Sequence, residues 1–187
     1  MHKKLVLASQ SPRRRELVTK LGVAFNVVSP TSDETLDSSL TVEEQIERIS
    51  EEKALSVFEN YQDCVVLGSD TVVVFNGEVL GKPKNEEDAK DTLMKLSGSK
   101  HDVITGVCLV SSECKRVFSV KTEVEFFELT EAEIDAYVAT KEPLDKAGSY
   151  SIQGFGSVFV KEIVGDFYSV MGLPISRVNQ ELIHNEW

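Results

Sequence analysis

Residues 64–75 read Cys64-Val-Val-Leu-Gly-Ser-Asp-Thr-Val-Val-Val-Phe75, a stretch that is mostly apolar on both sides of one carboxylate. A short run of this kind, rich in β-branched residues, is typical of a strand that is buried on both faces. Asn76-Gly77 follows it, and this dipeptide is the strongest signal for a two-residue hairpin, so a partner strand is expected over 78–80. The stretch therefore predicts a central strand in a sheet that other elements cover.

Outside this strand, strand patterns and helix patterns alternate along the chain. Before it we expect a strand over 4–8, a helix from Ser11-Pro12 to about 21, a strand over 25–28 and a helix from about 41 to 59. After it we expect a helix over 86–96, strands near 101–111 and 116–128, a helix over about 131–139, a loop over 141–156, strands over 157–164 and 167–171, and a last helix from Pro174. The pattern predicts an α/β protein with a mixed sheet flanked by helices.

The composition is that of a globular protein with an acidic surface. Hydrophobic residues make up 41% of the 187 residues, and the formal net charge is −11. Duplex nucleic acid and anionic membranes would repel such a surface on average. No apolar run approaches the roughly 18 residues of a membrane span, and the N-terminal residues do not resemble a signal peptide. We therefore expect a cytoplasmic protein with no nucleic-acid or membrane partner, which could bind an anion only through a local basic pocket.

Two arginines stand where a helix normally carries acidic residues. Arg13 and Arg14 fall in the first turn of the helix that Ser11-Pro12 opens. The helix dipole disfavours each cation there by about 0.3–1 kcal/mol and favours anions. Free backbone N–H groups and two guanidinium groups would form a phosphate site, although the glycines and the Lys-Ser/Thr of a Walker A loop are absent. A solvated basic helix start is the alternative.

Asp70 is the carboxylate that interrupts the central apolar strand. A buried carboxylate without a partner is costly, so we expect it to meet a cation, a metal ion or hydrogen-bond donors. Carboxylates at strand ends commonly serve as metal ligands or bases. An edge aspartate beside a β-bulge is the structural alternative.

Three further residues are weaker candidates. Lys53 lies on the apolar stripe of the helix over 41–59, where its side chain could extend to solvent or reach a phosphate in a cleft. Lys82 follows the hairpin and could return to the same cleft as Asp70, although by itself it is a turn lysine. Gln153 lies in the charged loop over 141–156 and could contact a base edge through its amide, or belong to an ordinary surface loop.

Most of these candidates lie in motifs that resemble those of the Maf family. The motifs come in the family's order over residues 4–175: Ser9-Gln-Ser-Pro-Arg-Arg-Arg-Glu-Leu17, Gly68-Ser-Asp-Thr-Val72, Gly81-Lys-Pro83, Leu96-Ser-Gly-Ser-Lys-His101 with Thr105-Gly-Val107, Lys141-Glu-Pro-Leu-Asp-Lys-Ala-Gly148 with Ile152-Gln-Gly154, and Val170-Met-Gly-Leu-Pro-Ile175. Each motif alone is weak, but the ordered set is specific. The resemblance implies one Maf-like domain over residues 1–187, with two lobes around a central cleft, similar to the inosine triphosphatases.

The resemblance also implies an activity. Maf proteins cleave nucleoside triphosphates between the α- and β-phosphates with the help of a divalent cation, Mg²⁺ or Mn²⁺, which suggests a role in cleaning the nucleotide pool. The aspartate that matches Asp70 is taken as the proton acceptor, and the residue could instead hold the metal. The positions counted as substrate-binding are Ser9, Arg13, Arg14, Lys53 and Lys82. Family analogy further suggests a homodimer.

Three positions indicate the substrate. The branch of the family that prefers dTTP and UTP has Arg, Thr and Gln where this chain has Arg13, Thr71 and Gln153, whereas the branch that prefers 7-methyl-GTP has Trp, Gln and Glu. Modified pyrimidine triphosphates would suit the same residues. The family's functional acid in the loop after the second strand falls on Asp33-Glu34, and Glu34 is our candidate metal ligand.

Two other functions remain open at this point. One is a nucleotide-binding regulator of cell division or septum formation, which the family's name suggests. The other is a phosphatase or sugar-nucleotide hydrolase that uses the same phosphate site. Asp70 favours hydrolysis over passive binding, and the net charge of −11 counts against direct DNA binding.

Overall fold

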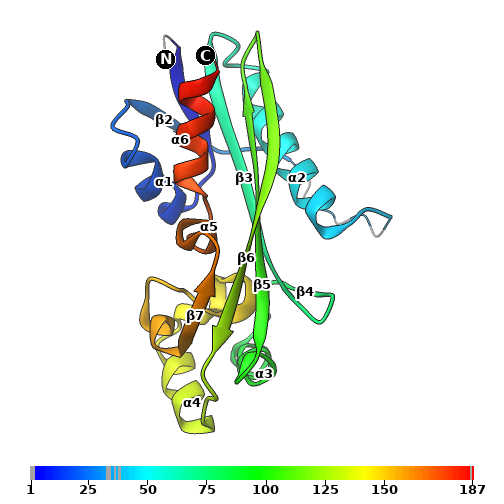
Figure 1. The fold of residues 1–187 in the computed structure, drawn as a ribbon, viewed down its shortest axis with the longest axis vertical. Coiled ribbons are helices and arrows are strands. Elements are labelled where there is room, and N and C mark those ends of the chain that lie inside the picture. Colours follow the sequence, from blue (N-terminus) through cyan, green and yellow to red (C-terminus); the bar gives the residue numbers. More distant parts are fainter. Residues whose placement is uncertain (1–2, 33–34, 36, 38, 186) are drawn as a thin grey trace. The chain divides into compact units, whose positions relative to one another are not determined.

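Strands and helices alternate along the chain, as the sequence predicts (Figure 1). The structure is a computed structural model, and it describes residues 3–32, 35, 37, 39–185 and 187. The strands are β1 (Lys4–Ala8), β2 (Phe25–Val28), β3 (Cys64–Phe75), β4 (Glu78–Leu80), β5 (Lys100–Val110), β6 (Lys115–Phe126) and β7 (Val160–Val164). The α-helices are α1 (Pro12–Thr19), α2 (Val42–Phe58), α3 (Glu86–Leu96), α4 (Glu131–Ala139), α5 (Phe167–Met171) and α6 (Ile175–His184), and three short 3₁₀ helices cover Glu142–Asp145 (η1), Ala147–Ser149 (η2) and Phe155–Phe159 (η3).

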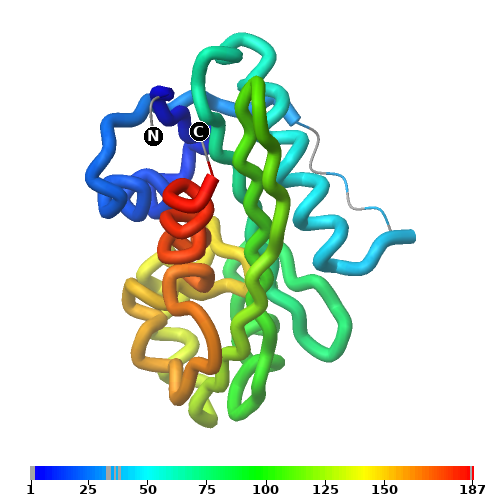
Figure 2. The backbone as a smooth tube through the Cα atoms, turned by 45° about the horizontal axis from the view of Figure 1, so that its top comes forward, coloured from blue at the N-terminus to red at the C-terminus, as the bar shows by residue number. Residues whose placement is uncertain are grey.

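The strands form one mixed sheet in the order β2-β1-β3-β5-β6-β7, with β4 paired to β3. Strand β1 runs parallel to both of its neighbours, which places Leu5 opposite Phe25 on one side and opposite Val65 on the other. Strands β4 and β7 are antiparallel to β3 and β6. Figure 2 shows β5 and β6 as two long adjacent strands. The predicted mixed α/β fold is confirmed.

The chain divides into two compact units. The first contains Met1–Asp70, Thr105–Val120 and Gly172–Trp187, and the second contains Thr71–Ile104 and Lys121–Met171. Strands β3, β5 and β6 each contribute residues to both units. We describe each unit by itself, and the predicted central cleft and the single domain over 1–187 stay predictions.

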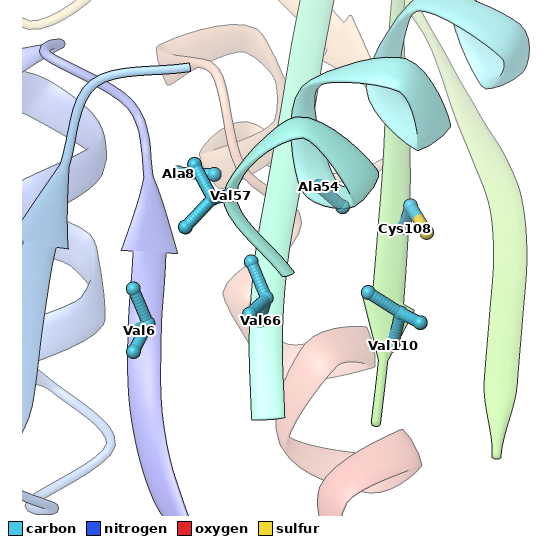
Figure 3. Close-up of a cluster of buried hydrophobic side chains, with 7 residues drawn as sticks. All are labelled: Val6, Ala8, Ala54, Val57, Val66, Cys108 and Val110. Atoms are coloured by element: carbon cyan, nitrogen blue, oxygen red, sulfur yellow. The ribbon is translucent and has the colours of Figure 1, made fainter. Parts of the chain in front are cut away.

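In the first unit, helix α2 covers one face of the parallel strands. Side chains at every second position of the strands point toward it, because successive residues of a strand face opposite sides. The buried cluster that they form with α2 consists of Val6, Ala8, Ala54, Val57, Val66, Cys108 and Val110 (Figure 3). The residues between them on β1 and β3, Leu5, Leu7 and Leu67, are fully buried too. In Figures 1 and 2, α1 and α6 lie on the other side of these strands from α2, so the strands are buried on both faces, as predicted.

In the second unit, an aromatic cluster lies beside buried aliphatic residues such as Leu93 and Leu96. The ring of Phe126 meets those of His101, Tyr150 and Phe159 edge-on, with centroids 4.9, 4.8 and 6.1 Å away. Tyr137 on α4 meets Phe159 in the same way at 5.0 Å. Edge-to-face pairs of this kind contribute about 0.5–1.5 kcal/mol each beyond the area that they bury.

Two local predictions were wrong near the C-terminus. Residues 167–171 form the helix α5 rather than a strand, because Asp166 Oδ1 accepts hydrogen bonds from the N–H groups of Tyr168 (2.7 Å) and Ser169 (3.2 Å) and thereby caps the helix. The strand expected from 157 begins only at Val160, since the preceding residues form η3. The apolar run alone did not distinguish a strand from a short helix.

The helices of the described residues include none that could cross a lipid bilayer.

Candidate active site

Two glycines allow α2 to lie unusually close to the sheet in the first unit. A Cβ on Gly68 would lie 2.4 Å from the carbonyl oxygen of Ser50 and 2.7 Å from the backbone nitrogen of Ala54. A Cβ on Gly106 would lie 2.5 Å from the carbonyl oxygen of Ile46. These distances are shorter than any ordinary contact, so only glycine permits this approach. The backbone of α2 around Lys53 is therefore held directly against β3.

This close approach brings Lys53 to Asp70. Asp70 lies two residues after Gly68 and therefore on the face of β3 that α2 covers. The Nζ atom of Lys53 lies 2.7 Å from Asp70 Oδ1, and the two side chains are 7% and 16% exposed. Lys53 does not extend to solvent, and its contact with a phosphate stays a prediction. The cation that we expected beside Asp70 is a residue of the chain itself.

Asp70 lies within β3, which continues to Phe75 as predicted. The pairing of β3 with β1, however, stops at Ala8 and Gly68. Ser9 and Asp70 therefore both lie just beyond the last paired residues, at the carboxyl end of β1. In sheets with parallel strands, ligands commonly bind at this edge.

The helix α1 begins at the same edge. Ser11 is the N-cap and accepts a hydrogen bond from the backbone N–H of Arg14 at 3.4 Å, and Pro12 opens the helix. The buried hydroxyl oxygen of Ser9 accepts from the N–H of Ser11 at 3.1 Å and so fixes the turn before the helix. The first turn contains no acidic residue, and Arg13 and Arg14 are both half-buried. An anion site at this helix start stays a prediction, which the two arginines and the helix dipole favour.

Arg14 is tied to the strand that carries Asp70 through a third segment. Its Nε donates a hydrogen bond to the carbonyl oxygen of Gly172 at 2.7 Å. The hydroxyl of Ser69, which is fully buried, lies 2.8 Å from the carbonyl oxygen of Gly106 and 3.2 Å from that of Gly172. Ser69 directly precedes Asp70, so Gly172 joins the arginine of the anion site to the backbone beside the carboxylate. The sequence analysis missed Ser69 and Gly172, although a serine inside an apolar strand was a visible signal.

The first unit contains part of the predicted site. Ser9, Arg13, Arg14, Lys53 and Asp70 lie in the first unit, as described above. The other candidates belong to the second unit, where Thr71 is half-buried and Lys82 and Gln153 are exposed. Asp33 and Glu34 fall outside the described residues.

The site could hold a divalent cation through a single carboxylate. The described residues contain no group of three or more His, Cys, Asp or Glu side chains that could hold a metal ion by themselves. Mg²⁺ often binds through one or two carboxylates while keeping several waters and contacting the phosphates of the substrate. Asp70, a carboxylate beside a phosphate-type site, fits that mode as one ligand.

Comparisons with known proteins agree with the motifs. A family model described as "Maf-like protein" matches residues 4–185. A protein named dTTP/UTP pyrophosphatase from Bacillus cereus (strain ATCC 10987 / NRS 248) is 51% identical over 180 residues, which are 96% of this chain and 89% of the relative. A protein of the same name from Bacillus thuringiensis subsp. konkukian (strain 97-27) is also 51% identical, over 96% of this chain and 94% of the relative.

Solved structures resemble the chain only distantly. The Staphylococcus aureus Ham1 protein matches with a TM-score of 0.45 and 17% identity, over 66% of this chain and 72% of that one. Protein VC0702 from Vibrio cholerae matches with a TM-score of 0.37 and 8% identity, over 84% and 74%. Neither likeness is close enough to support a conclusion about the site.

Proposed function

This chain belongs to the Maf family, and we propose that it is a nucleoside triphosphate pyrophosphatase that hydrolyses dTTP and UTP to the monophosphate and pyrophosphate. The observation that carries this proposal is the Lys53–Asp70 pair, which lies at the same sheet edge as the arginine-bearing N-terminus of α1. A carboxylate and an anion site at one edge are the two parts that hydrolysis of a phosphoanhydride requires. The name of the relatives at 51% identity supports the same substrates.

In this proposal, some residues of the first unit neutralise the charge of the phosphates and one transfers a proton. Arg13, Arg14 and the N–H groups of α1 bind phosphate oxygens and offset their negative charge. Asp70 accepts a proton from the water that attacks the α-phosphorus, or it would instead hold a divalent cation that supplies positive charge there. Lys53 fixes the carboxylate through its hydrogen bond and adds positive charge beside the phosphates. Pyrophosphate then leaves.

The rest of the proposal rests on the motifs. Asp70 would hold a bound Mg²⁺ or Mn²⁺, which would supply positive charge to the phosphates. Lys82 is assigned to phosphate, and Arg13, Thr71 and Gln153 to the preference for thymine and uracil. An arginine donates to carbonyl oxygens, and a glutamine amide both donates and accepts, so the pair suits the alternating edge of these bases. We also propose that the enzyme is a homodimer that cleans the nucleotide pool in the cytoplasm.

Product analysis on the purified protein tests the reaction. The protein is incubated with UTP, dTTP, CTP, GTP and 7-methyl-GTP in the presence of Mg²⁺ or Mn²⁺, and the products are identified. Monophosphate plus pyrophosphate from UTP and dTTP supports the proposal. Release of free phosphate would indicate a phosphatase, and binding without turnover would favour a regulatory nucleotide-binding protein.

A double substitution tests the base preference separately. Gln153→Glu with Thr71→Gln introduces the residues of the branch that prefers 7-methyl-GTP, so kcat/KM for UTP should fall relative to that for 7-methyl-GTP. An amide left unpaired against the wrong base costs about 1–3 kcal/mol, or about 5- to 150-fold in affinity. An unchanged ranking of substrates would remove these residues from the proposal and leave the pyrophosphatase activity intact.

A further inference from the structure

The carboxylate of Glu142 accepts two hydrogen bonds from the loop that carries Gln153. Glu142 begins η1 (Glu142–Asp145) and is half-buried. Its Oε2 accepts a hydrogen bond from the N–H of Phe155 at 3.0 Å, and its Oε1 accepts from the N–H of Gly156 at 3.2 Å. These N–H groups begin η3 and have no partners within it, because the first donors of any helix lack them. Glu142 thus supplies acceptors to a helix start that lies 13 and 14 residues further along the chain.

Tyr137 holds the loop by a hydrogen bond on the other side of Gln153. Its hydroxyl donates a hydrogen bond to Glu142 Oε1 at 2.8 Å and accepts one from the N–H of Ser151 at 3.1 Å. The loop is therefore anchored at Ser151 and again at Phe155 and Gly156. Gln153 lies between these anchors with an exposed side chain. Three backbone hydrogen bonds to two side chains, which a fourth hydrogen bond joins to each other, thus fix the backbone on both sides of one glutamine.

Gly154 makes the contact with Glu142 possible. A Cβ on Gly154 would lie 2.2 Å from Glu142 Oε2 and 2.5 Å from its carboxyl carbon. No side chain fits at that distance, so the carboxylate can reach the N–H groups only because glycine follows Gln153. In the dipeptide Gln153-Gly154, the glutamine therefore supplies an exposed side-chain amide. The glycine leaves room for the carboxylate of Glu142, which holds the backbone.

We propose that Glu142 is a positioning residue for base selectivity: it holds the 151–156 loop so that Gln153 presents its amide in one orientation. The inference rests on the proposed function, in which Gln153 contacts the base. Selectivity by hydrogen bonds requires donors and acceptors whose positions are fixed before the ligand arrives, because a mobile amide adapts to several base edges. Glu142 would thus act on the ranking of substrates without touching any of them.

The substitution Glu142→Gln weakens the hydrogen bonds to the loop with minimal change in the shape of the side chain. Both carboxylate oxygens of Glu142 accept hydrogen bonds, whereas an amide has one acceptor oxygen and one NH₂ group. One of the N–H groups would therefore face another donor. Glu133→Gln is the matched control, because Glu133 also accepts a backbone hydrogen bond, from Thr130 at 2.8 Å, but caps α4 instead of the loop.

Two measurements on the full-length protein test the inference. Hydrogen exchange should show that the amides of residues 151–156 exchange roughly tenfold faster in Glu142→Gln than in the wild type or in Glu133→Gln. The ratio of kcat/KM for UTP to that for GTP should fall by roughly tenfold in Glu142→Gln alone, with a smaller effect on kcat for UTP. Tyr137→Phe, which removes the link to Ser151, should change both quantities in the same direction and by less.

The possible failures can be told apart. If the loop loosens but the ratio for UTP and GTP is unchanged, Glu142 is a structural cap and the inference is wrong. If exchange is unchanged, the carboxylate does not hold the loop, and the inference is again wrong. A wild type that does not discriminate between UTP and GTP would instead overturn the proposed base preference, and with it the inference.

Discussion

Each unit contains a mostly buried polar pair, and these two pairs differ in charge. In the first unit, Lys53 Nζ lies 2.7 Å from Asp70 Oδ1. In the second unit, His101 Nε2 lies 2.8 Å from the hydroxyl oxygen of Tyr150. The first pair combines two opposite charges at a sheet edge, where Asp70 keeps 16% of its side chain exposed. The second is enclosed among aromatic rings, and His101 is only 3% exposed.

The surroundings explain the difference. Burial lowers the pKa of His101 from 6.5 to about 4, although Asp102 opposes this shift, so the imidazole is neutral at pH 7. Its Nδ1 is buried without a hydrogen-bond partner in the described part of the chain. A neutral pair of this kind contributes to packing. A charged pair that keeps an exposed edge costs desolvation and is better explained by chemistry than by stability. The comparison teaches that hydrogen-bond length alone does not identify a functional pair.

The largest effect is expected for Asp70→Asn. The amide can still accept a hydrogen bond from Lys53, but it cannot take a proton, so kcat for UTP should fall by about 10²–10⁴-fold. The variant should still fold, but with a lower melting temperature, because Lys53 loses its opposite charge at a mostly buried position. Asp135→Asn is the control, since it breaks an exposed pair with Lys90 that is 2.6 Å long and should leave kcat unchanged. Turnover of Asp70→Asn at the wild-type rate would contradict the assigned role.

Lys53→Met should give the next largest loss of activity and also a loss of stability. It leaves the carboxylate of Asp70 unpaired at a mostly buried position, which should lower the free energy of unfolding by roughly 2–4 kcal/mol. We expect kcat/KM for UTP to fall by about 10- to 100-fold. The double variant with Asp70→Asn should regain much of the stability but none of the activity. If the double variant is no more stable than Lys53→Met, the ion pair is not what the single substitution disrupts.

A smaller effect, on stability alone, is expected in the second unit. Tyr150→Phe removes the partner of His101 Nε2 and should lower the free energy of unfolding by about 1–3 kcal/mol in urea titrations. Adding His101→Phe removes the stranded polar group and should recover part of the loss. Activity per folded molecule should stay near the wild-type value in both variants. A loss comparable to that of Asp70→Asn would show that this pair is not merely structural.

The last effect is a dependence of stability on pH, which is small near pH 7. The unfolded chain protonates His101 near pH 6.5, whereas the folded protein resists protonation until about pH 4. Between these values the unfolded state binds more protons, so stability is complete above pH 6.5 and falls as the pH drops, by at most about 1.4 kcal/mol per pH unit. The double variant His101→Phe with Tyr150→Phe should lose this contribution. The free energy of unfolding of the wild type and of this double variant is measured by urea titration at several pH values. Equal slopes of that free energy against pH in the two proteins would contradict the assignment.

The sequence by itself determined the elements whose signals are local. The hairpin at Asn76-Gly77 and the helix starts at Thr41 and Thr130 were predicted correctly, because a turn or a capping box depends on about four adjacent residues. The sequence also singled out Asp70, Arg13 and Arg14 as residues in unfavourable local positions. Their unfavourable placement is visible without any knowledge of what lies nearby.

Only the tertiary structure decided which of these residues meet. The sequence left Lys53 between solvent and a cleft, and it became the partner of Asp70 because Gly68 and Gly106 let α2 rest on the strands. Residues 167–171 became a helix through the cap that Asp166 provides, against the pattern of their side chains. The hydrogen bonds of Glu142 join its carboxylate to backbone N–H groups 13 and 14 residues further along the chain. Such contacts escape local patterns, since they form only where packing brings distant backbone segments within hydrogen-bond distance.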